Sequence, residues 1–145
     1  MAVNLNWLDA CSRMQEAIEQ SKSLLVRMEQ PYLTDKRLIP EVHELLKPYL
    51  ASYDKGTAVR AEMLILLYLF APSRLIRQKQ GRFQIMTDIA RVMGLQRSNA
   101  YMYKVALIHT YRYYDDFRKL VDEGLRIVAE HYGIQGEIMR HNDEN

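Results

Sequence analysis

Four consecutive polar residues, Gln96, Arg97, Ser98 and Asn99, follow a Gly-Leu pair and carry side chains suited to hydrogen-bonding nucleic-acid bases. An arginine guanidinium can bind guanine O6 and N7 in a bidentate manner, and an asparagine or glutamine amide can pair with adenine N6 and N7. We therefore expect base contacts from the start of the helix that this segment opens. The residues assigned to them are Gln96, Arg97, Ser98, Asn99, Tyr101 and Lys104.

Basic side chains surround this segment. Residues 63–114 hold eight Lys or Arg against one acid, Asp88, whereas the rest of the chain holds twelve bases and seventeen acids. The overall net charge of +2 therefore hides a polarised molecule. Lys and Arg beside a recognition helix bind phosphates and fix its position without reading sequence. The residues expected to reach phosphates are Arg74, Arg77, Lys79, Arg82, Thr87 and Arg91.

A helix-turn-helix would place these side chains correctly. It needs a small residue where two helices cross, a turn residue that tolerates left-handed geometry and an apolar residue after it, and Ala90, Gly94 and Leu95 supply these in order. Ile89 would face inward in the first helix. Ser98 or Gln96 can cap the second helix, whose N-terminal end would enter a major groove. The alternative is a helical hairpin with a glycine turn that touches no DNA.

The stretch 87–101 resembles the helix-turn-helix of bacterial and phage regulators, in which an Ile-Ala pair, a Gly-Leu turn and an Arg-Ser start to the recognition helix recur. The resemblance covers about 20 of the 145 residues and implies DNA binding through the second helix. Tyr101-Met102-Tyr103 is bulkier than usual for a recognition helix. The wider layout, a small trihelical unit between long helices, is similar to small terminase subunits of tailed phages, which implies viral DNA recognition and ring assembly.

The first expected element is a helix over residues 5–29, because the segment lacks Gly and Pro. Apolar and small side chains recur in it at alternating steps of four and three, which places them on one helical stripe. This stripe predicts either a coiled-coil seam, and hence a dimer arm, or a long helix lying on the core of its own domain. Its members are Trp7, Cys11, Met14, Ile18, Ser21, Leu25 and Met28.

The remaining pattern also predicts helices. We expect one over 35–53, a turn at 54–57 with Thr57 as N-cap, a buried central helix over 58–70, and the motif helix over 83–93. The partner helix from residue 97 either continues to about residue 132 as one rod or breaks near Asp115-Asp116, where a carboxylate could cap a new helix. Gly133 is expected to end the last helix, before a polar tail.

The fold class expected is all-α, a helical bundle with a central helix-turn-helix and long flanking helices. One all-helical domain should span 1–134, with a leading helix or oligomerisation arm at 5–30, a core at 57–113 and a polar tail at 135–145. Six glycines and four prolines in 145 residues agree with a helical chain. A single cysteine, Cys11, excludes an intrachain disulfide.

Other clusters point to chemistry less strongly. Tyr101, Tyr103, Tyr111, Tyr113 and Tyr114 lie among basic residues and could stack on single-stranded nucleic acid, but we favour core and interface packing with Tyr111 and Tyr114 inward. His43 is expected to be solvated beside two glutamates, and the acidic residues at 115–116 and 122–123 to form a solvated face. Neither a phosphate-binding glycine loop nor a nucleophile with a base is recognisable, so we expect no enzymatic activity, cofactor or metal.

The leading hypothesis is a non-enzymatic DNA-binding protein, a transcription regulator or a phage DNA-packaging recognition subunit. Its expected partners are double-stranded DNA and further copies of itself, with no membrane and no small-molecule substrate. The start of the chain lacks the pattern of a signal peptide, and its longest apolar run, residues 63–71, is too short to span a bilayer, so we expect the cytoplasm of a bacterial or phage-infected cell. The alternative is a helical structural or assembly protein of a viral particle, or a protein-binding adaptor.

Overall fold

The computed structural model describes residues 5–28, 30–72, 75, 84–96 and 107–134. Its helices are α1 (Leu5–Met28), α2 (Leu38–Leu50), α3 (Lys55–Phe70), α5 (Gln84–Met93) and α7 (Asp115–Tyr132), and residues 107–113 form a further helix before α7. These ranges contain no strand. The expected all-α class is confirmed.

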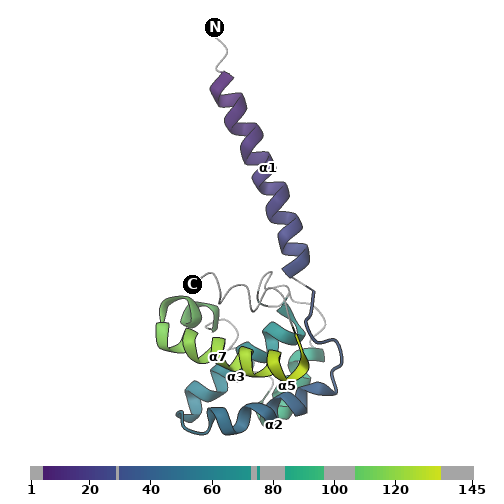
Figure 1. The fold of residues 1–145 in the computed structure, drawn as a ribbon, viewed down its shortest axis with the longest axis vertical. Helices are drawn as coiled ribbons and strands as arrows, with labels where there is room; N and C mark the ends of the chain where they lie inside the picture. The colour runs from purple at the N-terminus through teal and green to yellow at the C-terminus, as the bar shows by residue number, and fades with distance from the viewer. Residues whose placement is uncertain (1–4, 29, 73–74, 76–83, 97–106, 135–145) are drawn as a thin grey trace.

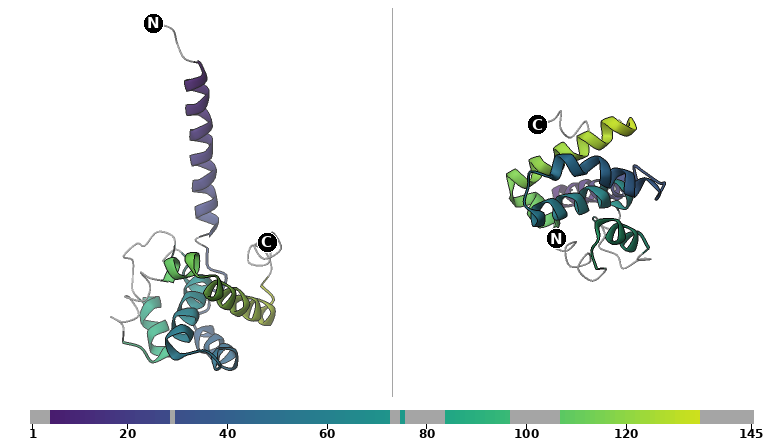
Figure 2. Two further views of the ribbon diagram at one scale, coloured as in Figure 1. Left: turned by 90° about the vertical axis from the view of Figure 1, so that its left-hand side faces the viewer. Right: turned by 90° about the horizontal axis from the view of Figure 1, so that it is seen from below.

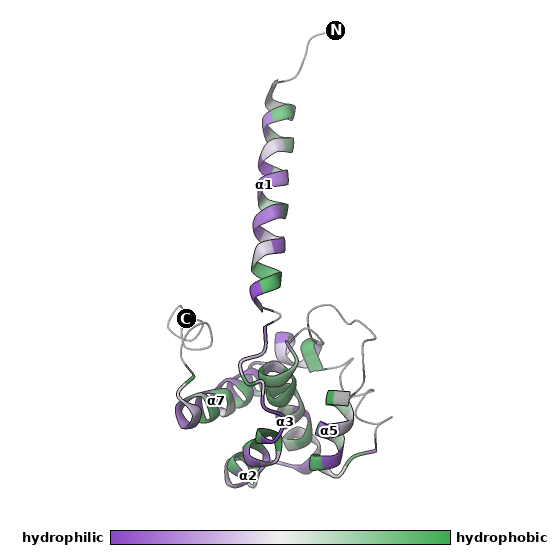
Figure 3. Cartoon of the chain, turned by 90° about the vertical axis from the view of Figure 1, so that its right-hand side faces the viewer, coloured by the Kyte–Doolittle hydropathy of each residue, from purple (hydrophilic) through white to green (hydrophobic). Residues whose placement is uncertain are grey.

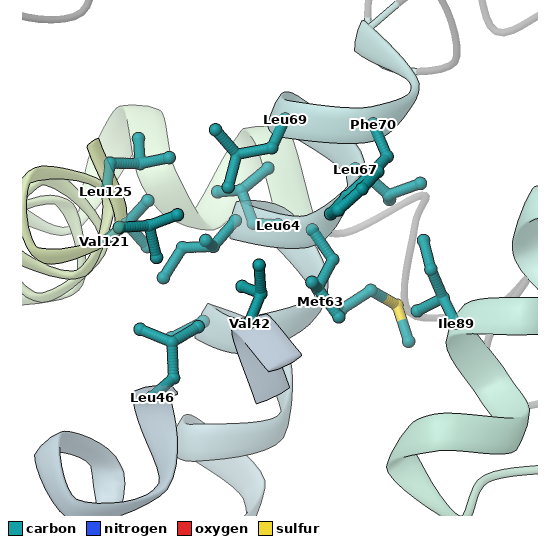
Figure 4. Close-up of a cluster of buried hydrophobic side chains, with 14 of the residues drawn as sticks. Val42, Leu46, Met63, Leu64, Leu67, Leu69, Phe70, Ile89, Val121 and Leu125 are labelled. Carbon is teal, nitrogen blue, oxygen red and sulfur yellow. The ribbon is translucent and has the colours of Figure 1, made fainter. Parts of the chain in front are cut away.

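Helix α3 is the centre of the hydrophobic core. Its residues 61–67 are all buried, because the sequence there is apolar around the whole circumference of the helix apart from Glu62. Helices α2, α5 and α7 pack around it. Figure 4 shows Met63 reaching toward Ile89 of α5, while Val121 and Leu125 of α7 meet α3 from the other side. The expectation of a buried central helix is correct.

The core is wider than the expected span of residues 57–113. Val42 and Leu46 of α2 and Val121 and Val128 of α7 are buried in it as deeply as α3 itself. Helix α7 comes close to α3 because Gly124 has no side chain: a Cβ there would lie 2.6 Å from Ile65 Cδ1. The expected core boundaries are therefore wrong at both ends.

Two tyrosines join α2 and α7 by hydrogen bonds. The Tyr49 hydroxyl donates to the carbonyl oxygen of Leu120 at 2.8 Å, and the Tyr132 hydroxyl donates to Glu41 Oε2 at 3.2 Å. Burial, with smaller contributions from Tyr53 and Glu123, raises the pKa of Tyr49 to about 12. Its hydroxyl therefore stays protonated and remains a donor throughout the physiological range.

Helix α1 stands away from the body formed by α2, α3, α5 and α7 (Figures 1 and 2). Of its side chains from residue 7 to residue 27, Leu25 is half-buried and all the others are exposed. The apolar stripe therefore does not lie on the core of its own chain, which was one of the two arrangements expected. The periodicity was compatible with both because a 3.5-residue and a 3.6-residue repeat cannot be separated over three heptads.

The segment that follows α1 is fixed to the C-terminal end of α3. The backbone N–H groups of Tyr32 and Leu33 both donate to the carbonyl oxygen of Leu69, at 2.9 and 3.0 Å. The Tyr32 ring stacks on that of Tyr68 with centroids 5.3 Å apart, and Leu33 is buried in the core. The chain is thus held to the body within a few residues of the end of α1.

Asp54, rather than the expected Thr57, is the N-cap of α3. Its carboxylate accepts from the backbone N–H of Thr57 at 3.1 Å and from the Thr57 hydroxyl at 2.7 Å. These hydrogen bonds lower the pKa of Asp54. An aspartate N-cap accepts a hydrogen bond from the backbone N–H three residues ahead, so Thr57 donates to the cap and is not the cap itself.

The chain breaks at Tyr114, so the single rod considered for residues 97–132 does not form. Tyr114 is extended, with φ −119° and ψ 107°, and precedes α7 without a side-chain capping hydrogen bond. The Arg118 guanidinium holds the bend by donating to the carbonyl oxygens of Tyr111, at 3.2 Å, and of Arg112. Asp115 and Asp116 lie in the first turn of α7, where negative charge favours the helix dipole, but neither caps it.

Candidate nucleic-acid interface

Helix α5 has the two faces that the first helix of a helix-turn-helix requires. Met86, Ile89 and Ala90 are buried against α2 and α3, and Val92 and Met93 pack at the edge of the core. The expected inward position of Ile89 is confirmed, and Met86 joins it one turn earlier. On the outward face, residues four apart lie on successive turns, so their side chains would project toward the same ligand.

The end of α5 is a Schellman turn centred on Gly94. Gly94 adopts φ +70°, and its N–H donates to the carbonyl oxygen of Arg91 at 3.3 Å, while the N–H of Leu95 donates to that of Ala90 at 2.8 Å. This 6→1 and 5→2 pair ends a helix and turns the chain away from its axis. Leu95 then packs against the core. The left-handed turn expected at Gly94 is confirmed.

Thr87 and Arg91, two of the expected phosphate contacts, lie one helical turn apart on α5. The Arg91 side chain is 72% exposed, whereas Thr87 is half-buried. Arg91 Nη1 lies 3.9 Å from Asp88 Oδ1, longer than the 2.7–2.9 Å typical of a charge-assisted hydrogen bond. The guanidinium is therefore accessible for an anion such as a phosphate.

Gln96, an expected base contact, is exposed immediately after the turn, so three of the twelve expected contacts lie among the described residues. Nine of them lie outside the described residues: Arg74, Arg77, Lys79, Arg82, Arg97, Ser98, Asn99, Tyr101 and Lys104. The structure therefore places Thr87 and Arg91 on α5 and Gln96 just after the turn that ends it.

A second exposed surface lies just before the bend at Tyr114, and we call His109, Arg112, Tyr113 and Tyr114 the aromatic-basic patch. The His109 and Tyr113 rings lie 4.6 Å apart, and the Arg112 guanidinium lies 5.5 Å from the centre of the Tyr113 ring. Tyr113 is 62% and Tyr114 61% exposed. The inward position expected for Tyr114 is wrong, because its extended backbone does not continue the helix of residues 107–113.

Tyr111 does face inward, as expected. Its hydroxyl donates to Asp122 Oδ1 at 2.7 Å, and burial together with this hydrogen bond raises the pKa of Tyr111. Asp122 is therefore part of a tertiary contact, contrary to the solvated face expected for residues 122–123. In a continuous helix, eleven residues would separate the two side chains by ~16 Å along the axis, so the pair depends on the bend at Tyr114 and not on a sequence period.

His43 and Glu62 form a pair that sequence reasoning missed. His43 Nδ1 is hydrogen-bonded to Glu62 Oε1, with side-chain exposures of 21% and 8%. Burial raises the pKa of Glu62, and the hydrogen bond and charge of His43 oppose that rise. The expectation of a solvated His43 is wrong, since its partner comes from α3 rather than from neighbouring glutamates. The hydrogen bond between them joins α2 to α3.

Comparison with known protein families, with curated proteins and with solved structures finds no match to this chain. Within the described ranges, no three His, Cys, Asp or Glu side chains come together as metal ligands. None of the described helices is both long enough and apolar enough to cross a bilayer. The site must therefore be interpreted from its own geometry and charge.

Proposed function

We propose that this protein binds double-stranded DNA through a helix-turn-helix and performs no chemistry itself. In this proposal α5 is the first helix, Gly94 is the turn, and the segment from Arg97 onward supplies the recognition helix. The protein would act as a homo-oligomer, as a transcription regulator or as the recognition subunit of phage DNA packaging.

The observation that carries the proposal is the Schellman turn at the end of α5. A helix with a buried inner face, a left-handed glycine after it and an apolar residue packed behind the turn is the local geometry of the motif. Many helical hairpins contain such a turn, so charge supplies the second argument. Eight Lys or Arg against one acid between residues 63 and 114 suit a polyanion, whereas the acidic residues gather in the rest of the chain.

Fluorescence anisotropy of labelled duplex DNA, titrated at several salt concentrations, tests the proposal. Binding should weaken steeply with salt, because each phosphate contact releases condensed counterions. Arg91→Ala should lower the slope of log K against log salt by about 0.9, the value of one lost phosphate contact. Arg126→Ala removes an equally charged, half-exposed side chain from the acidic helix α7 and is the matched control.

Arg97→Ala with Asn99→Ala should reduce binding to a selected site while leaving weak binding to random duplex nearly unchanged. Circular dichroism would verify that the variant keeps the helical content of the parent. Equal affinity of parent and double variant for every duplex would contradict base recognition by this segment. Absence of any salt-dependent binding at low ionic strength would contradict DNA binding altogether.

A second candidate function is a helical assembly protein of a viral particle, or an adaptor that binds other proteins. The exposed apolar side chains of α1 favour it, because such a face is suited to protein contact. In that case the basic segment would meet an acidic protein surface. The same titration separates the two candidates, since assembly without DNA contacts predicts no binding to duplex at low salt.

A further inference from the structure

Helix α1 exposes an apolar surface that a single chain leaves in water. Trp7 and Met14 are each 64% exposed, Ile18 is 50% and Leu24 is 48% exposed. Figure 3 shows apolar positions recurring along the whole projecting helix. Most of the stability of a helix in a protein comes from packing of its apolar face, and between residues 7 and 27 of α1 only Leu25 is even half-buried. This surface is therefore suited to a partner.

The charges of α1 identify the class of partner. Three acids and three bases give the helix no net charge. Arg13 pairs with Asp9 at 3.1 Å and Lys22 with Glu19 at 3.6 Å, so these charges are balanced within one helix. A membrane surface or a nucleic acid would require an excess of Lys and Arg. A second copy of α1 meets no electrostatic repulsion, and its stripe has the same heptad spacing.

We infer that α1 pairs with α1 of a second copy in an antiparallel coiled coil. This inference rests on the homo-oligomer of the proposed function but not on its DNA contacts. In heptad terms, Cys11, Ile18 and Leu25 occupy a positions, and Trp7, Met14 and Ser21 occupy d positions. Most of the charged side chains lie on the opposite face of the helix, at the b, c and f positions.

The antiparallel register follows from the sizes of the side chains. When the two helices cross near residue 16, Trp7 meets Leu25 of the second copy and Met14 meets its Ile18. The two small residues, Cys11 and Ser21, then meet each other. At the g positions, Ala17 would meet Ala17 of the second copy and Ala10 would meet its Leu24, which are apolar contacts. In a parallel pair, Ala10 and Ala17 would instead meet the polar residues Gln15 and Lys22.

The area available is sufficient for such a pair. Burying one Leu- or Met-sized side chain removes on the order of 100 Å² of apolar surface from water. Five or six such side chains on each of two helices give about 1,000 Å² in total, the lower bound for a specific interface. An area at this lower bound is typical of weak, transient complexes, so the pair should dissociate on dilution.

Sedimentation equilibrium of the full chain at tens of micromolar tests the pairing. The parent should show twice the chain mass of 17.1 kDa, and Met14→Glu with Ile18→Glu should show the single-chain mass. Ser12→Glu with Ser23→Glu adds the same charges to the opposite face and should remain dimeric. If the parent is oligomeric and Met14→Glu with Ile18→Glu leaves its mass unchanged, the α1 interface is overturned but a homo-oligomer is still supported. A monomeric parent would overturn both, and the anisotropy titration would still decide DNA binding separately.

Disulfide trapping tests the orientation. In the antiparallel register, Cys11 of one copy lies beside residue 21 of the other, whereas the two Cys11 residues lie ~15 Å apart along the axis, too far to bridge. Ser21→Cys should give a covalent dimer within minutes of mild oxidation. The parent, with Cys11 alone, and Cys11→Ser with Ser21→Cys should both stay unlinked. Efficient linking of either single-cysteine chain would show a parallel pair and overturn the orientation.

Discussion

His43→Ala should be among the more destabilising single substitutions in the body of the protein. The substitution leaves the Glu62 carboxylate, whose side chain is 8% exposed, without the hydrogen bond from His43. Removing one partner of a buried pair costs about 3–5 kcal/mol, and we expect about 2–4 kcal/mol here because the cavity at the partly exposed His43 admits water. That is a large part of the 5–15 kcal/mol by which ordinary domains are stable.

The loss should depend on pH in a definite direction. Burial already raises the pKa of Glu62, and removing His43 takes away the interactions that oppose this rise. A carboxyl group whose folded-state pKa lies above its unfolded value binds more protons when folded, so stability falls as pH rises through that window. The difference between variant and parent should therefore be larger at pH 7 than at pH 5.

Urea unfolding followed by far-UV circular dichroism, at one protein concentration and at both pH values, measures these differences. Adding Glu62→Gln to His43→Ala should recover most of the loss at pH 7, because the buried group becomes neutral. Arg37→Ala is the control beside α2, since it breaks an exposed pair with Asp35 and should leave the urea midpoint nearly unchanged. A His43→Ala variant as stable as the parent at pH 7, or equally destabilised at both pH values, would refute the reasoning.

Two glycines should respond to substitution for different reasons. A Cβ at Gly94 would meet nothing within 4 Å, so Gly94→Ala should cost only the ~1–2 kcal/mol of left-handed backbone strain. Gly94→Asn should cost less, because asparagine tolerates this geometry better. Equal losses of stability on thermal unfolding would argue against the left-handed turn. A Cβ at Gly124 would lie 2.6 Å from Ile65 Cδ1, so Gly124→Ala should cost about 1–2 kcal/mol despite its better helix propensity. Ile65→Val removes that methyl group, and a double-mutant cycle that proved additive would show that the two positions do not clash.

Sequence patterns predicted the features that depend on local composition. The central helix was predictable because residues 63–67 are apolar on every side, and such a segment is buried wherever the other elements lie. The turn at Gly94 was predictable because its geometry requires glycine. The end of the last helix at Gly133, which also has a positive φ of 67°, followed from the same argument.

Features that depend on tertiary contacts were not predictable in this way. Leu107, Tyr114, Val121 and Val128 recur at intervals of seven, as they would in one continuous helix. The bend at Tyr114 is instead held by Arg118, which reaches back to two carbonyl oxygens. His43 and Glu62 are nineteen residues apart on different helices, so neither position indicates the other. The stripe on α1 was recognised, but its periodicity does not distinguish a core of the same chain from a second copy.

The carbonyl oxygen of Leu69 gives the molecule a mechanical junction. It holds the backbone of Tyr32 and Leu33, just after the projecting helix, and it lies at the last turn of α3, just before the chain enters its most basic stretch. A displacement of the arm would therefore act on the C-terminal end of α3 through these two hydrogen bonds. In an antiparallel pair, the two cores would lie at opposite ends of the paired arms, so the length of α1 would set the distance between them.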